Sequence, residues 1–182
     1  MCIRDRESID FITARELFSG VGEGRFAPDT PMTRAMFVSV LHRLAGSPEV
    51  NLDQAVEFTD VPEDTWYSSA VAWASANGIV SGYGDGTFGP EDKISREQMC
   101  VIFALYMKYA RIELGQSEEV IPFIDEKEIG GYAREAVTLC QGTGLISGVG
   151  NNAFNPKGTA NRDQVAAIFS RLIHKVLESK IK

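Results

Sequence analysis

The chain has 182 residues, a net charge of -7 and a pI near 4.9, with 44% hydrophobic and 24% charged residues. This balance is typical of a globular protein, and the acidic charge argues against nucleic acid or anionic lipid as the main partner. No apolar run approaches the roughly 20 residues that span a bilayer, and the N-terminus lacks the apolar stretch of a signal peptide. We therefore expect no membrane insertion, and we expect any export signal to lie outside this sequence.

The chain contains three copies of one pattern. A Ser-Gly pair, then a Phe and a Pro, recur with offsets of 62 and then 66 residues. The aligned sets are Gly20, Gly82 and Gly148; Phe26, Phe88 and Phe154; Pro28, Pro90 and Pro156; and Arg34, Arg96 and Arg162. Such self-similarity indicates a repeat architecture in which neighbouring units bury a shared core.

The first unit, residues 7–46, matches only the later part of the pattern. Shifted by the first offset, Ile9 aligns with Val71, but Arg4 falls where Trp66 stands. Residues 1–6 also resemble the translated end of an adapter used in preparing sequencing libraries. We therefore expect residues 1–6 to be non-native and the first repeat to be truncated at its N-terminal end.

The second unit, residues 58–110, predicts a helix, a glycine-rich loop and another helix. Apolar residues at helical spacing favour a first helix over Trp66–Asn77 that ends at Gly78. The loop Ser81–Gly86 has too many glycines for a helix, and the Phe that follows it is expected to enter the core. Ser95, with Gln98 at capping-box spacing, should begin the second helix.

The third unit, residues 123–173, follows the same order, with polar linkers over 46–57 and 111–122 and a helical tail over 174–182. No single unit can bury the apolar faces of two such helices. We therefore predict a mainly α fold in which three helix–loop–helix repeats pack around a common axis as one cooperative domain.

The second unit resembles a complete S-layer homology (SLH) repeat, and the other two resemble it with departures. The matching runs are Phe58–Val61, Trp66-Tyr67, Asn77–Gly82, Gly86–Pro90 and Ile94–Gln98. The resemblance implies a pseudo-threefold prism whose inter-repeat grooves bind secondary wall polysaccharide carrying pyruvate ketals. It also implies a non-catalytic, secreted module at the bacterial cell surface, with cargo domains upstream.

The resemblance places ligand contacts on the Arg of a four-residue motif, here Thr33–Met36, Ser95–Gln98 and Asn161–Gln164, none of which has the usual Glu at its fourth place. An Arg in the first turn opposes the helix dipole, so its recurrence needs a reason. Free N–H groups at the helix start and in the glycine-rich loop, beside a guanidinium, would suit a carboxylate. Alternatively, these arginines pair with acidic residues of a neighbouring unit.

Other candidate residues have two interpretations each. Trp66 either stacks on a sugar or anchors the core, and Asp60 and Asp125 either accept hydrogen bonds from sugar hydroxyls or cap a turn. The full set of candidate ligand-binding residues is Arg34, Arg96, Arg162, Asp60, Trp66, Asp125, Ser81, Gly82, Gly84, Ser147 and Gly148.

Rival functions have less support. No nucleophile elbow, His-Glu-x-x-His or phosphate loop is present, and we expect neither an enzyme nor a cofactor. Asp85, Glu91 and Asp92 lie around a glycine-rich loop, which leaves a calcium-binding module as an alternative, beside a protein-assembly module. The three cysteines, Cys2, Cys100 and Cys140, lack metal-site spacing. Cys100 and Cys140 are expected to be buried apolar residues, or alternatively to form a disulfide with each other.

Overall fold

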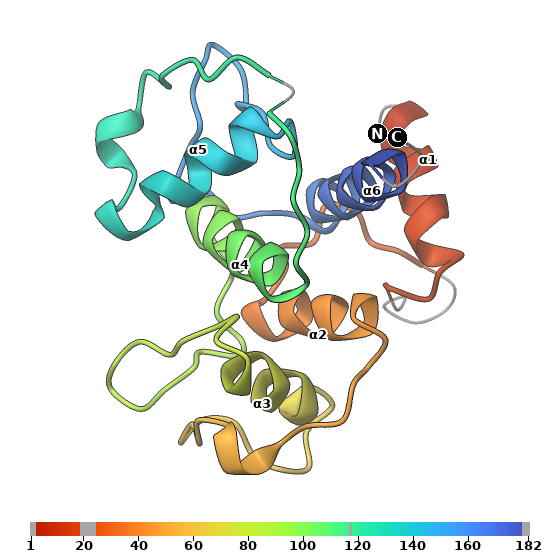
Figure 1. Ribbon diagram of the computed structural model, residues 1–182, viewed down its shortest axis with the longest axis vertical. Helices are drawn as coiled ribbons and strands as arrows, with labels where there is room; N and C mark the ends of the chain where they lie inside the picture. Colours follow the sequence, from red (N-terminus) through yellow and green to blue (C-terminus); the bar gives the residue numbers. More distant parts are fainter. Residues whose placement is uncertain (1–2, 19–24, 117, 180–182) are drawn as a thin grey trace.

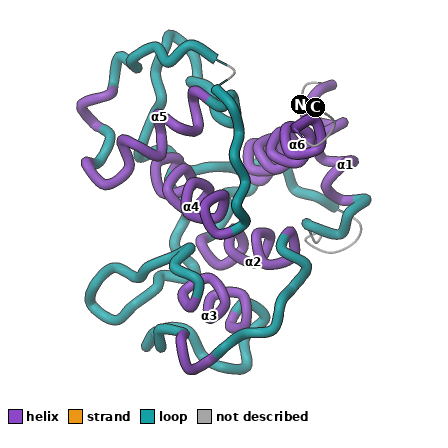
Figure 2. The backbone as a smooth tube through the Cα atoms, in the orientation of Figure 1, coloured by secondary structure: helices purple, strands orange, loops and turns teal. Residues whose placement is uncertain are grey.

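A computed structural model describes residues 3–18, 25–116 and 118–179, and in these the fold is built from helices (Figures 1 and 2). The described α-helices are α1 (Ile3–Thr13), α2 (Arg34–Leu44), α3 (Ser68–Ala76), α4 (Arg96–Tyr109), α5 (Arg134–Gly142) and α6 (Arg162–Ser179). Short 3₁₀ turns cover Leu52–Gln54, Glu126–Glu128 and Gly131–Ala133. The prediction of a mainly α fold is confirmed.

Each packed helix pair joins two different repeats. Helix α2 of the first unit packs against α3 of the second, α4 of the second against α5 of the third, and α6 of the third against α1 of the first (Figure 1). The two helices within one unit are therefore not each other's main partners. Because of this cyclic order, the unit that repeats in the sequence is not the pair of helices that pack together.

Backbone hydrogen bonds close a ring through the three repeats. The N–H of Met32 donates to the carbonyl of Ala160 (2.9 Å), that of Ala160 to Ile94 (3.1 Å), and that of Ile94 to Met32 (3.0 Å). Isolated antiparallel bridges between the same three segments accompany these bonds. The ring sits just before the start of α2, α4 and α6, so it fixes the positions of all three helix starts.

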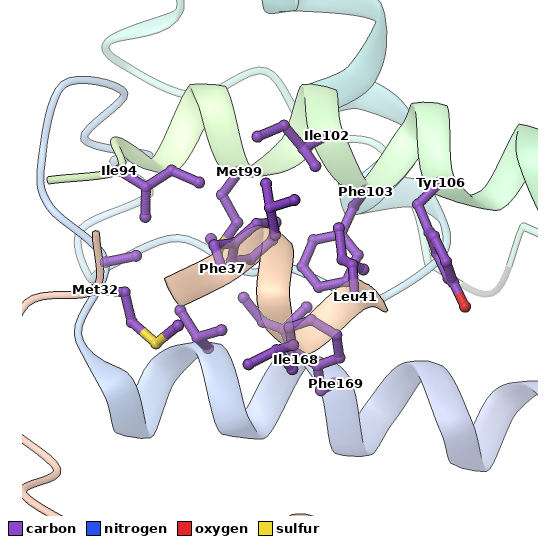
Figure 3. Close-up of a cluster of buried hydrophobic side chains, with 14 of the residues drawn as sticks. Met32, Phe37, Leu41, Ile94, Met99, Ile102, Phe103, Tyr106, Ile168 and Phe169 are labelled. Carbon is purple, nitrogen blue, oxygen red and sulfur yellow. The ribbon is translucent and has the colours of Figure 1, made fainter. Parts of the chain in front are cut away.

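Apolar side chains from these three helices fill the centre of the molecule (Figure 3). Phe37 of α2, Phe103 of α4 and Phe169 of α6 are fully buried, and their ring centroids lie 5.0 to 5.7 Å apart. Phe88 and Phe154, from the glycine-rich loops, are also fully buried, as the sequence predicted. A core shared in this way stabilises all three repeats together.

Most of the predicted helix ends are confirmed. Ser95 and Gln98 form the reciprocal capping box, and Gly78 has a φ of +65°, the left-handed conformation that closes a helix. Helix α3 begins at Ser68 rather than Trp66, because residues 65–67 form a turn in which the Ser68 hydroxyl donates to the carbonyls of Glu63 and Thr65.

The predicted tail is not a separate segment. Helix α6 runs without a break from Arg162 through residue 174 to Ser179, and it packs against α1. Residues 3–6, which belong to the segment predicted to be non-native, form the first turn of α1. None of the described helices combines the length and the apolar character needed to cross a bilayer.

Candidate ligand-binding site between the repeats

The repeated arginines reach from one repeat into the loop of the next. The Nε atom of Arg34 donates to the carbonyl of Phe88 (2.9 Å) and its Nη2 to that of Ser81 (3.3 Å). Arg96 does the same with Phe154 (2.8 Å) and Ser147 (2.9 Å) in the third repeat. Each side chain is 5% exposed. Nothing in the sequence indicated that these arginines bind backbone carbonyls rather than carboxylates.

Arg162 closes the cycle. Its Nε donates to the carbonyl of Phe26 (2.8 Å) in the first repeat, and its guanidinium lies over the ring of the same residue. Residues 19–24 of the first repeat lie outside the described residues. Burial lowers the pKa of all three arginines, because desolvation disfavours the charged form. An arginine nevertheless keeps its charge at neutral pH.

The expected free N–H groups at the helix starts are not free, which corrects the sequence-based view of a carboxylate site there. In α4 the N–H of Arg96 donates to Gly158, that of Glu97 to Pro156, and that of Gln98 to the Ser95 hydroxyl. Helix α2 repeats this arrangement through Asp92 and Pro90. The neighbouring repeat occupies these donors because the ring of backbone bonds brings its chain across each helix start.

Asp60 and Asp125 bind the loops of their own repeats. The two carboxylate oxygens of Asp60 accept the N–H groups of Phe88 and Gly89, both at 2.8 Å. Asp125 accepts those of Phe154 (2.8 Å) and Asn155 (2.7 Å). Partial desolvation opposes ionisation of Asp125, but the two N–H donors outweigh it and lower its pKa. These contacts match the turn-capping interpretation of both residues.

The Ser-Gly pairs stand where two segments meet closely. A Cβ atom on Gly82 would lie 2.3 Å from the Thr87 carbonyl oxygen and 2.7 Å from the ring of Phe58. On Gly148 it would lie 2.7 Å from the Ala153 oxygen. Glycine is therefore required by close approach at these two positions, whereas Gly84 has a φ of +88° and open space around it.

Of the candidate residues, the structure brings Arg96, Ser147 and Gly148 together at one cavity of about 240 Å³. We call this the Arg96 cavity, and Ile146, Val149, Asp163, Gln164, Ala167, Ile168 and Arg171 complete its lining. The Nη1 atom of Arg96 donates to no described residue, because the side-chain hydrogen bonds of Arg96 come from Nε and Nη2. It can therefore offer two N–H donors to a group in the cavity.

A larger, more open cavity of about 710 Å³ lies nearby and is lined by residues of the second and third repeats. We call it the Tyr132 cavity; its lining is Tyr83, Glu91, Asp92, Lys93, Ser95, Glu97, Gln98, Tyr132 and Lys157. The Glu97 carboxylate is almost fully buried in its wall. Glu97 accepts the N–H of Gly130 and the hydroxyl of Tyr132, and it pairs with the ammonium of Lys157.

Trp66 is 60% exposed, and its ring makes an edge-on contact with that of Tyr67. It is therefore not a core residue. Tyr132, which aligns with it in the third repeat, is 63% exposed. The buried indole is instead that of Trp73.

Sequence reasoning missed several residues that line these cavities, namely Tyr83, Glu97, Tyr132, Lys157, Gln164 and Arg171. Most of them vary between the repeats, so searching for recurrent positions passes over them. For Arg171 the sequence contains a partial signal, because this residue aligns with Arg43 in the first repeat, although Leu105 occupies the position in the second.

The carboxylates considered for calcium do not converge. Asp85 accepts the amide and hydroxyl of Thr87, and Asp92 accepts the hydroxyl of Tyr83. Among the described residues, no group of acidic, His or Cys side chains has the geometry to hold a metal ion. Cys100 and Cys140 are buried free thiols, while Cys2 is outside the described residues.

Several known proteins contain a segment that is similar in sequence to this chain. The chain is 30% identical over 93% of its length to an amylopullulanase of Thermoanaerobacterium thermosulfurigenes, of which it covers 9%. It is 25% identical over 94% of its length to the surface-layer 125 kDa protein of Lysinibacillus sphaericus, covering 14%, and 32% identical over 50% to a cellulosome-anchoring protein of Acetivibrio thermocellus, covering 21%. The model of the S-layer homology domain matches residues 5–36, 57–100 and 122–166, so the chain belongs to the S-layer homology domain family.

Proposed function

We propose that this chain is a non-catalytic module that anchors a longer protein to the bacterial cell wall by binding pyruvylated secondary wall polysaccharide between its repeats. The observation that supports this most is the Arg96 cavity. There the buried guanidinium of Arg96 donates to two carbonyl oxygens, and the same residue lines an accessible space. A guanidinium binds a carboxylate well, because it can donate two parallel charge-assisted hydrogen bonds.

The relatives support anchoring rather than catalysis. Their names are an amylopullulanase, a surface-layer protein and a cellulosome-anchoring protein, and the chain covers no more than 21% of each of these three. A role that such different proteins can share is attachment. The cargo would then be the remainder of a longer surface protein.

Exposed aromatic rings fit a carbohydrate ligand. Trp66, Tyr83 and Tyr132 present large faces to solvent, and aromatic faces of this kind pack against the C–H groups of sugar rings. The acidic overall charge means that attraction of an anionic sugar must come from local arginines rather than from the whole surface.

Sedimentation with purified cell-wall sacculi tests the proposal. The chain should co-sediment with intact sacculi, and it should stay in solution when the secondary polysaccharide has been stripped from them. Binding to stripped sacculi, or to neither, would contradict the proposal. Adding a chelator distinguishes wall binding from a calcium-dependent function, because the proposed contacts involve no metal. Analytical ultracentrifugation without sacculi detects self-assembly.

A further inference from the structure

Two cysteines lie together at one of the three helix pairs that join the repeats. Cys100 is on α4 of the second repeat and Cys140 is on α5 of the third, and these two helices pack against each other. The thiol of Cys140 donates to the carbonyl of Cys100, with 3.9 Å between sulfur and oxygen, and both side chains are fully buried. The two thiols are therefore neighbours inside a closed interface between two repeats.

The offsets of 62 and 66 residues make these two positions equivalent to partners at the other helix pairs. The matched positions there hold apolar residues, namely Val38 and Ala74 between α2 and α3, and Ala166 and Ile12 between α6 and α1. All four of these side chains are fully buried. Apolar residues are thus sufficient to pack such an interface, and packing alone does not require a thiol on each side of it.

The closed environment decides when the thiols can react. Burial raises the pKa of the Cys100 thiol well above its ordinary value, and the adjacent Cys140 thiol raises it further. Because the thiolate is the form that attacks a disulfide, exchange with a dissolved disulfide is slow while α4 and α5 stay packed. The pair is therefore reactive before this interface closes during folding, or when it opens.

We propose that Cys100 and Cys140 are a cross-linking site, at which an oxidant of the small-disulfide class forms a disulfide that joins the second repeat to the third. One thiolate attacks the small disulfide and releases one thiol, and the other thiolate then attacks the mixed disulfide and releases the second thiol. The S–S bond of the chain forms, that of the oxidant breaks, and two electrons and two protons pass to the released thiols. This chemistry goes beyond wall anchoring and does not depend on it.

The cross-link holds one wall of the Tyr132 cavity in place. Glu97, near the start of α4, accepts the N–H of Gly130 and the hydroxyl of Tyr132 from the third repeat. A covalent bond between α4 and α5 keeps the two sides of these contacts together, and it restricts the unfolded chain between residues 100 and 140. We therefore expect the oxidised chain to be more stable than the reduced one.

The test uses the whole chain with Cys2→Ser, which leaves only this pair of thiols. The chain is refolded from urea with oxidised glutathione and, in parallel, with reduced glutathione. The oxidised sample should lose two hydrogen atoms in mass and should give a linked Cys100–Cys140 peptide when it is mapped without reductant. Its Tm should exceed that of the reduced sample by about 5 °C or more, and reduction in urea followed by refolding should abolish the difference.

Cys140→Ala in the same background is the matched control, because alanine occupies the aligned position 74 of α3. It should fold, and its Tm should not rise after refolding with oxidised glutathione. Cys100→Val, which copies Val38 of α2, provides the same control if the alanine variant folds poorly.

Three results from the Cys2→Ser chain would overturn the cross-linking site. They are recovery of unmodified thiols alone, recovery of two separate mixed disulfides with glutathione, and a linked chain whose Tm does not exceed that of the reduced chain. An equal rise in the Tm of the control variant would overturn it as well. None of these results bears on sedimentation with sacculi, so the cross-link and wall anchoring can fail separately.

Discussion

Arg34 and Arg96 make contacts in the structure that differ from those predicted from the sequence. Each connects two repeats through two hydrogen bonds from a buried guanidinium to backbone carbonyls. The alternative interpretation, pairing with acidic residues of a neighbouring unit, is wrong about the acceptors, which are backbone carbonyls, although the contacts do join two repeats. Since the Nη1 atom of Arg96 is unused, a structural role and a binding role do not exclude each other.

We expect Arg34→Ala to lower the free energy of unfolding by about 3 kcal/mol, because two buried carbonyls lose a charged donor. For a chain of this size such a loss corresponds to a fall in Tm of roughly 6–12 °C. Urea unfolding followed by circular dichroism measures it. Arg134→Ala, which removes an exposed arginine of α5, is the control and should change stability by less than about 0.5 kcal/mol. Equal stability of the two variants would show that the inter-repeat contact contributes nothing to the free energy of unfolding.

Glu97 gives a pH-dependent contribution to stability. Desolvation opposes its ionisation, but the Gly130 N–H, Lys157 and Tyr132 outweigh this and hold its pKa below the ordinary value of 4.5. Because the folded-state pKa is lowered, the contribution is fully present above about pH 4.5 and is lost as the pH falls through the folded-state value. Glu97→Gln should therefore be less stable than wild type by about 1–3 kcal/mol at pH 7.

The stability difference between wild type and Glu97→Gln should shrink steadily below about pH 4.5. Denaturant unfolding at several pH values follows it, with Glu91→Gln as a control for an exposed carboxylate of the same cavity. A difference that is independent of pH would mean that the buried carboxylate contributes through packing alone.

At the scale of elements, the glycine-rich loop is an ordered part of the groove wall. Asp60 holds two of its N–H groups, Arg34 two of its carbonyls, and Phe88 anchors it in the core. The loop thus connects its own repeat to the preceding one. Its shape depends on the backbone of Gly82 passing close to the Thr87 carbonyl.

Gly82→Ala should destabilise the fold by about 1–3 kcal/mol, because the added Cβ would overlap a backbone oxygen that cannot move without shifting the loop. Thermal unfolding measures the effect. The comparison is Gly115→Ala in the second linker, where a Cβ meets no atom within 4 Å and where stability should be unchanged or slightly raised. If both substitutions had the same effect, close approach would not be the reason for the glycine.

At the scale of the whole molecule, the cyclic pairing of helices predicts cooperative unfolding. Each helix pair and each buried arginine contact is shared by two repeats, so no repeat can leave the fold without breaking two interfaces. Tryptophan fluorescence, to which Trp73 buried in α3 contributes, and helical circular dichroism should therefore report the same urea transition. Separate transitions would show that the repeats unfold one at a time.

A fragment comparison tests the same idea. Residues 30–80 contain the packed pair α2–α3, whereas residues 58–110 contain one complete sequence repeat whose helices pack mainly on other repeats. Both fragments are short for independent stability. We nevertheless expect greater helicity in fragment 30–80 by circular dichroism, and the reverse order would contradict the exchange of partners between repeats.

The sequence alone determined the local features of this protein. The recurrence of Ser-Gly, Phe and Pro located the loops and the buried rings, and the Ser95–Gln98 spacing located a helix start, because caps, glycines and apolar periodicity act over a few residues. The same signals gave the family and the mainly α fold. They also singled out Arg96, Ser147 and Gly148, which do meet at one cavity.

Only the tertiary structure decided which repeat contacts which, and with what atoms. Offsets of 62 and 66 residues show that units are equivalent, but they do not say that α2 packs on α3 or that Arg34 binds the carbonyl of Phe88. Backbone acceptors have no sequence signature, since every residue has a carbonyl. The difference between the surroundings of Arg34 and Arg96 arises likewise from Tyr83, Val149 and Arg171, residues that vary among the repeats and become neighbours only when the ring of helices closes.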